Sequence, residues 1–278
     1  MDVSYLSLIM FIIITILYFS IPTIGKPLLT VEILNEPDGL TDYYSLTMSR
    51  LALYILAIIV SQLFLNSSYL ITKCGGDVSK NIGAAALFTF IPWVLIFGVL
   101  VAVLLMFPAF KNAFSDVIGY FVVSSSANNI LSSILIGTDL NKLIDQTQDQ
   151  TKKTELTYAA EAIMKICGNK SILINQMNPE NFTTIWETLK PLMIQGAYED
   201  IGKKQALLDL VVLKDNIGEA FWYTYTAILI SSIVYYNLAT RGCVKDINTI
   251  KADHDQYIQE QEAAQKQSEL NNTTTYTM

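Results

Sequence analysis

The chain has 278 residues, of which 52% are hydrophobic and only 15% are charged, and its mean hydropathy is +0.39. An average soluble domain carries about 25% charged residues, so this deficit indicates long apolar stretches that stay out of water. The net charge of −7 and the pI of about 4.7 exclude the basic face that a nucleic-acid binder presents. We therefore predict an all-α polytopic membrane protein that binds the lipid bilayer and no nucleic acid.

Four windows without a charged side chain are long enough to cross a bilayer, whose apolar core needs about 20 helical residues. They cover residues 4–24, 51–72, 82–110 and 220–239. The first window has no basic residues before it and no small-residue cleavage site, so we interpret it as a retained span rather than a signal peptide. The third window is longer than a perpendicular crossing requires, which predicts a tilt or a bend.

Three residues in these windows are candidates for helix packing or a kink. Pro92 removes one backbone hydrogen bond from the third span and is expected to kink it. Gly98 and Gln62 are expected at helix contacts, because small side chains allow close approach and a buried amide can bond across an interface. A substrate pathway is the alternative interpretation, but the four windows contain none of the ionisable residues with which transporters bind ions or relay protons.

The remaining segments alternate between the two sides of the membrane. The N-terminus, the short turn 73–81 and the polar tail 240–278 share one side, and the connecting loop 25–50 and the long segment 111–219 share the other. Basic residues near the spans favour a cytoplasmic location for the first side. They are Lys73, Lys80, Arg241, Lys245 and Lys251 on that side and Lys26 and Arg50 on the other. Counting the lysines of the long segment narrows this difference.

The long segment predicts a helical domain, inserted between the third and fourth spans. Apolar residues recur at helical spacing from Leu156 to Cys167 and from Phe182 to Met193, and Asn181 precedes the second pattern as a helix start. We expect four or five helices that rest on the membrane surface. The stretch from Val117 to Val123 is expected to lie in the interface or to pack on this domain, although a full crossing would reverse the sidedness of everything after it.

The tail and the cysteines offer little chemistry. After a weak helical stripe from Ile247 to Ile258, the tail is expected to be partly disordered. A lone histidine, His254, favours neither catalysis nor a metal site. Cys74 and Cys243 share a side close to the membrane, where they are able to meet or to be acylated, but we expect unmodified thiols in a reducing compartment. We predict no enzyme activity, no catalytic or metal site and no cofactor.

The sequence from Ser61 to Phe110, SQLFLNSSYLITKCGGDVSKNIGAAALFTFIPWVLIFGVLVAVLLMFPAF, with FSDVIGYFVV after it, resembles multi-spanning membrane proteins of nucleocytoplasmic large DNA viruses of algae and protists. This resemblance implies a structural virion protein, a minor capsid protein that links an inner membrane of host origin to the capsid shell. It also implies a multi-copy assembly in contact with other capsid or membrane proteins. Aromatic residues dominate interfaces, so the candidate anchors are Trp186, Tyr198, Trp222 and Tyr223.

Two alternatives stay open. Four packed spans with Pro92 are compatible with a channel or transporter subunit. The layout of four spans with a large last loop is similar to the tetraspanins, which organise other membrane proteins. Their large loop has a Cys-Cys-Gly motif and several cysteines, whereas here the large loop has only Cys167.

Overall fold

The computed structural model describes residues 3–74, 78–136, 170–243 and 247–273. In these ranges the regular elements are helices, and the only extended pairing is a single antiparallel bridge between Leu135 and Met193. Four helical stretches are long and apolar enough to cross a membrane, namely 39–74, 78–106, 108–134 and 201–240. They differ from the predicted set in two places, because the predicted first span is a shorter apolar helix, Tyr5–Ser20, and the stretch 108–134 was not predicted as a span. The predicted all-α polytopic fold is confirmed.

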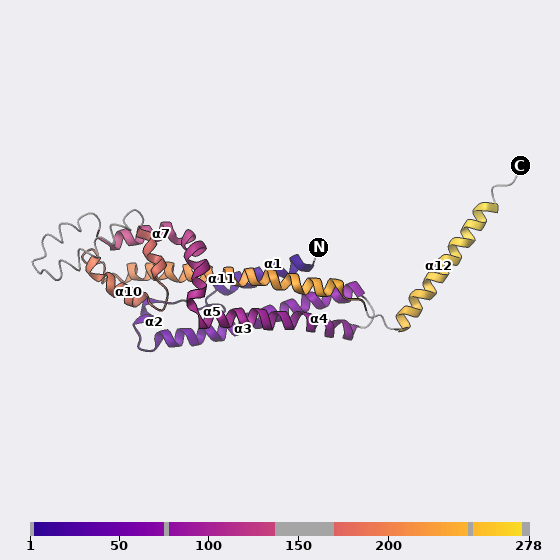
Figure 1. The fold of residues 1–278 in the computed structure, drawn as a ribbon, viewed down its shortest axis with the longest axis horizontal. Coiled ribbons are helices and arrows are strands. Elements are labelled where there is room, and N and C mark those ends of the chain that lie inside the picture. Colours follow the sequence, from indigo (N-terminus) through magenta and orange to yellow (C-terminus); the bar gives the residue numbers. More distant parts are fainter. Residues whose placement is uncertain (1–2, 75–77, 137–169, 244–246, 274–278) are drawn as a thin grey trace, which may run out of the picture.

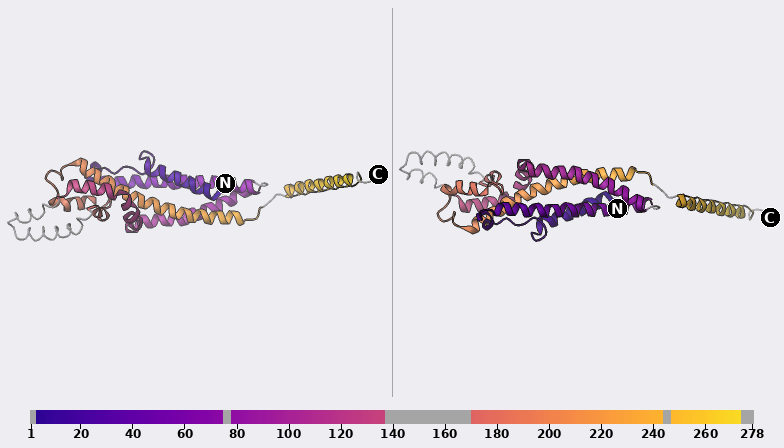
Figure 2. Two further views of the ribbon diagram at one scale, coloured as in Figure 1. Left: turned by 90° about the horizontal axis from the view of Figure 1, so that it is seen from above. Right: turned by 90° about the horizontal axis from the view of Figure 1, so that it is seen from below.

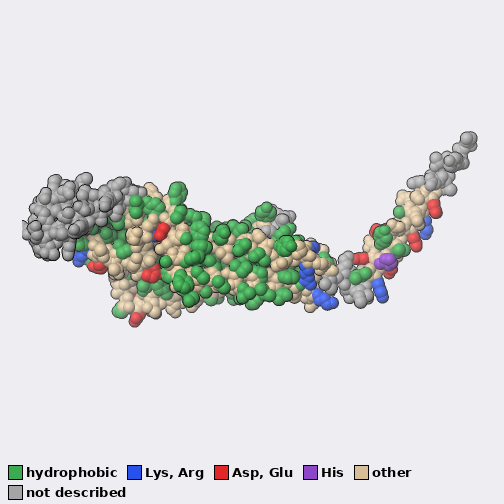
Figure 3. All heavy atoms as spheres, in the orientation of Figure 1, with side chains coloured by type: hydrophobic (Ala, Val, Ile, Leu, Met, Phe, Trp, Pro, Cys, Tyr) green, Lys and Arg blue, Asp and Glu red, His purple; other side chains and the backbone are tan. Residues whose placement is uncertain are grey.

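A bundle of long helices forms the membrane part (Figures 1 and 2). It contains α1 (Val3–Ser20), α3 (Gly39–Cys74), α11 (Ile201–Thr240), and a rod that begins as α4 (Val78–Pro92) and continues through the π-helical turn η1 (Trp93–Phe97) into α5 (Gly98–Met106). Phe11, Ile58, Trp93, Phe97 and Tyr223 lie in one buried core between these helices. Apolar side chains also cover the outer face of the bundle, as a surface in contact with lipid requires (Figure 3).

Two bundle helices are much longer than the predicted spans. α3 begins at Gly39 instead of residue 51, and α11 begins at Ile201 instead of residue 220. Their 36 and 40 residues correspond to about 54 and 60 Å of helix, against about 30 Å for the apolar core of a bilayer. The sequence prediction was wrong here because it started each span directly after a charged residue. These helices instead begin in the domain and pass through turns that contain charged residues before they reach the apolar stretch.

The first and third spans end earlier than predicted, in both cases close to a proline. α1 ends at Ser20, two residues before Pro22. The third span leaves the helical conformation at Phe107 (φ −130°, ψ 76°), because the ring of Pro108 disfavours the helical conformation in the residue before it. At Pro92 the rod passes into the π-helical turn and continues beyond it.

Pro108 starts a second rod, which turns away across the bundle (Figure 1). It consists of α6 (Pro108–Phe114), the π-helical turn η2 (Ser115–Gly119) and α7 (Tyr120–Ile134). The buried residues of α7, among them Val123 and Leu131, belong to the core of the domain and not to the bundle core. The stretch around Val117 therefore leads into the domain.

The domain is completed by α2 (Val31–Asn35), η3 (Lys170–Gln176), α10 (Phe182–Leu189), η4 (Lys190–Leu192) and the first half of α11. The predicted helix start at Asn181 is correct, since Asn178 and Asn181 exchange side-chain to backbone hydrogen bonds of 2.8 Å directly before α10. The predicted helix from Leu156 to Cys167 lies outside the described residues. The connection 25–50 is more than a loop, because Leu29, Val31 and Tyr43 are buried in the domain core.

The tail forms a helix, α12 (Ile247–Thr273), which lies apart from the bundle (Figure 1). The expected disorder is wrong for these residues. Gln, Glu, Ala and Lys are strong helix formers, and contacts one turn apart add to them. For example, Gln256 Nε2 donates to Glu260 Oε1 at 3.0 Å. Side chains from Lys251 to Glu269 are exposed.

Candidate functional site at the junction of bundle and domain

Buried charged residues gather where the bundle meets the domain. Lys26 Nζ lies 2.7 Å from Glu219 Oε2, and Lys111 Nζ lies 2.9 Å from Asp215 Oδ2. Lys111 Nζ also lies 4.0 Å from Glu219 Oε2. No side chain of these four is more than 14% exposed. Together they form the junction network.

Three separate segments supply the junction network. Asp215 and Glu219 are one turn apart on α11 and share a face of that helix. Lys111 comes from α6, and Lys26 comes from the turn after α1. That turn is tight, because Lys26 N donates to Tyr18 O at 2.8 Å and a Cβ on Gly25 would lie 1.9 Å from the same oxygen.

A second ion pair extends the junction to the π-helical turn η2. Lys214 Nζ lies 2.7 Å from Asp116 Oδ1, and the Lys214 side chain is only 3% exposed. Two glycines allow η2 and α11 to come this close. A Cβ on Gly218 would lie 2.5 Å from Ser115 Cβ, and a Cβ on Gly119 would lie 2.5 Å from the backbone oxygen of Lys214.

The carboxylates of the network favour the charged state of Lys26. Burial by itself would lower the pKa of Lys26, but the carboxylates of Glu219 and Asp215 outweigh burial and raise this pKa above its ordinary value. The other oxygen of Glu219, Oε1, accepts a hydrogen bond of 2.6 Å from the Tyr223 hydroxyl. A buried pair with its lone pairs satisfied in this way holds its geometry firmly.

A cavity of about 320 Å³ lies beside the network. Lys26, Lys111, Asp215, Glu219 and Glu180 line its polar side, and Leu51, Leu104 and Leu105 line its apolar side. Each of these charged side chains has a partner within the protein, since Glu180 accepts a hydrogen bond of 2.7 Å from the Tyr44 hydroxyl. The charges therefore hold structure together at this point.

The residues predicted for helix packing are in three different settings. Gln62 is fully buried, and its Nε2 donates to the backbone oxygen of Ser7 at 2.8 Å, across the contact between α3 and α1. Pro92 precedes the π-helical turn of the third span. Gly98 is not at a helix contact, because a Cβ added there would meet no heavy atom within 4 Å.

Two of the four predicted surface anchors are core residues. Trp186 and Tyr223 are each 1% exposed, the former inside the domain and the latter inside the bundle. The expectation that they contact a partner is wrong, since the aromatic content of a helix does not reveal which face it buries. Tyr198 and Trp222 keep partly exposed side chains, and Trp222 stacks on Phe110 at 4.5 Å between ring centroids.

The expectation of free thiols at Cys74 and Cys243 is also wrong, because these residues form a disulfide. The number of predicted spans between them placed both cysteines on one side of the membrane. The distance between the two cysteines, however, depended on where α11 ends. His254 is exposed on α12, and the described ranges hold no group of three His, Cys, Asp or Glu that suits a metal ion.

The chain matches no protein-family model, no curated protein and no solved structure. The junction network therefore has to be interpreted from its own geometry. Sequence reasoning missed this network, although a signal was available. Lys26 and Lys111 follow predicted spans within two residues and Glu219 precedes one directly, so all three charges lie at the same membrane level.

Proposed function

We propose that this chain is a structural membrane protein that holds a helical domain in a fixed orientation over a bilayer and ties that bilayer to a protein layer. The observation that carries this proposal is the course of α11. The helix contributes Leu207 and Val211 to the domain core and Ile230 and Leu238 to the bundle core. One unbroken helix in both cores couples the movements of domain and bundle.

The junction network supports a fixed orientation. Removing one partner of a buried ion pair costs about 3–5 kcal/mol, because the remaining charge is left without compensation. Tilting the domain away from the bundle would separate Lys26 and Lys111 from the carboxylates of α11. A scaffold benefits from such stiffness, since many copies have to present the same surface at the same height above the membrane.

The specific setting that we propose is the inner membrane of a virion, beneath its capsid shell. The resemblance of Ser61 to Phe110 to membrane proteins of large DNA viruses supports this setting. In that arrangement the chain is a minor capsid protein present in many copies, and the exposed surface of the domain contacts shell subunits. Tyr198, on that surface, is a reasonable contact residue.

Cross-linking mass spectrometry on purified particles tests the proposal. We expect lysine-reactive cross-links from Lys190 and Lys203, which lie on the domain, to a protein of the shell. Absence of the chain from particles, combined with enrichment in cell membranes next to other membrane proteins, would favour the organiser of the tetraspanin kind instead.

The cavity beside the junction network favours one other candidate, a channel or transporter subunit. Reconstitution of the purified chain into liposomes separates the two functions. The structural proposal expects ion flux no greater than in protein-free liposomes. Flux through the wild-type chain that disappears in the cavity variant Lys111→Met, but persists in the surface variant Lys190→Met, would overturn it.

A further inference from the structure

We infer that the bundle end with the Cys74–Cys243 disulfide faces an oxidising compartment, and that the helical domain faces the reducing side of the membrane. This orientation is opposite to the one that the basic residues of the sequence favoured. It does not depend on the proposed function, because a structural protein can adopt either orientation.

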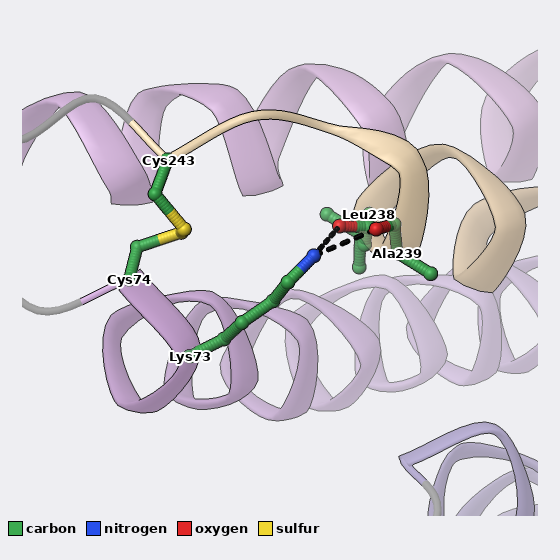
Figure 4. Close-up of a disulfide and its surroundings, with 5 residues drawn as sticks. All are labelled: Lys73, Cys74, Leu238, Ala239 and Cys243. Carbon is green, nitrogen blue, oxygen red and sulfur yellow. Dashed lines mark hydrogen bonds between the residues drawn. A yellow bond between two sulfur atoms is a disulfide. The ribbon is translucent and has the colours of Figure 1, made fainter.

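The contact between the two bundle helices at this end rests on more than the disulfide (Figure 4). Cys74 is the last residue of α3, Cys243 follows α11, and their Cα atoms lie 5.1 Å apart. The neighbouring Lys73 Nζ donates to the backbone oxygens of Leu238 at 3.1 Å and Ala239 at 2.7 Å, in the last turn of α11. The lysine thus supports the same approach of α3 and α11 that brings the two sulfur atoms together.

The chemistry of the bond points to an oxidising side. Two thiols form this disulfide by exchange with a disulfide-bearing oxidant, which is reduced to two thiols as Cys74 and Cys243 are oxidised. Such oxidants act in secretory and extracytoplasmic compartments, whereas the thiol systems of the cytosol keep exposed cysteines reduced. Cys243 is exposed, so cytosolic reductants would reach this bond if the end faced the cytosol.

The structure also removes the argument from basic residues. Since α11 runs directly from the domain into the membrane, Lys203, Lys204 and Lys214 lie within about 20 residues of the lipid-facing part and count toward the charge bias. The domain side then holds Lys26, Arg50, Lys111, Lys203, Lys204 and Lys214, and the disulfide side holds Lys73, Lys80, Arg241, Lys245 and Lys251. Six basic residues on one side against five on the other favour neither orientation, so the orientation is inferred from the disulfide.

Accessibility of engineered cysteines in oriented vesicles tests the inference. In a Cys167→Ser background, Thr184→Cys places a reporter on α10 and Ser268→Cys places one on α12, both at exposed positions. A membrane-impermeant maleimide is added to vesicles with the cytosolic face outward. We expect the α10 reporter to react in intact vesicles and the α12 reporter to react only after detergent.

The native cysteines and native glycosylation provide two readouts that need no reporter. Cys74 and Cys243 are expected to be alkylated only after detergent and reductant together. The acceptor motifs at Asn271 and Asn272 then face the glycosylating lumen, and those at Asn169 and Asn181 do not. The inference is overturned by labelling of the α12 reporter in intact vesicles, by free Cys74 and Cys243 without reductant, or by a glycan on Asn169 or Asn181. None of these results depends on whether the chain cross-links to a shell protein, so the orientation and the proposed function are tested separately.

Discussion

Glu219 is the residue on which the junction depends most. Its two carboxylate oxygens are shared between Lys26 and Tyr223, and Lys111 lies within 4.0 Å. The stability from the Lys26 pair is present at neutral pH, because a raised lysine pKa means that the charge is lost only as the pH rises through that value. A change at Glu219 therefore acts on three segments of the chain at once.

Replacing Glu219 by Gln is expected to lower the free energy of unfolding by about 3 kcal/mol, since Lys26 is then buried without a full opposite charge. Denaturant unfolding of the purified protein in detergent measures this change. The matched control is Glu199→Gln at an exposed position of the domain, with an expected change within about 0.5 kcal/mol. Equal effects of the two substitutions would show that the network adds nothing to stability.

Gly218 allows a second prediction at the residue scale. Gly218→Ala places a methyl group 2.5 Å from Ser115 Cβ, and we expect a loss of about 1–3 kcal/mol as α11 and η2 move apart. Gly98→Ala is the control, because a Cβ there has open space and alanine favours a helix by about 0.5–1 kcal/mol over glycine. Thermal unfolding of both variants is sufficient, and a stabilising Gly218→Ala would contradict the close crossing.

The individual residues were the hardest part to predict from the sequence. Hydropathy located the lipid-facing stretches, but it treated the charges beside them as simple boundaries. Lys26, Lys111 and Glu219 come from distant parts of the chain, so their pairing depends on how the helices pack. Trp186 and Tyr223 were assigned to the surface for the same reason, as burial of an aromatic ring is a tertiary property.

Single helices show a different balance between sequence and packing. Three of the four long apolar helices, 39–74, 78–106 and 201–240, each contain a window predicted from composition. The end of α1 near Pro22 and the end of α5 before Pro108 follow from proline geometry. The extension of α3 and α11 beyond the lipid follows from neither, because a helix continues through charged turns when its other face is buried in a domain. Uncharged windows mark only the part of a helix that lies in the bilayer, so they do not indicate how far α3 and α11 extend beyond it.

α12 is expected to be dispensable for the stability of the rest. Its described side chains, residues 250–269, are exposed, and none of them belongs to either core, so we expect deletion of residues 247–278 to leave both cores intact. The thermal midpoint of the shortened chain should stay within about 2 °C of the full chain, given that about 1 kcal/mol shifts the midpoint of a protein this large by about 2–4 °C. A fall of 5 °C or more would mean that α12 packs against the bundle or the domain.

At the scale of the whole molecule, the most useful property of the sequence was the even number of predicted membrane spans. The N-terminal end of α1 and the start of α12 lie at the same end of the bundle, as Figure 1 shows, and an even number of predicted spans requires this. The domain was harder to define, because part of its core, including Leu29, Val31 and Tyr43, comes from a connection that hydropathy marks as a loop. Such composite domains are set by long-range contacts, which no local pattern encodes.

The central claim is that domain and bundle form one stiff unit, and a distance measurement tests it most directly. Spin labels at Thr184→Cys in α10 and Phe64→Cys on the exposed face of α3, in a Cys167→Ser background, report the distance between domain and bundle in nanodiscs. Double electron–electron resonance is expected to give a single narrow distance distribution, which broadens when Glu219→Gln is added. A broad or multiply peaked distribution in the protein with an intact junction would contradict the claim.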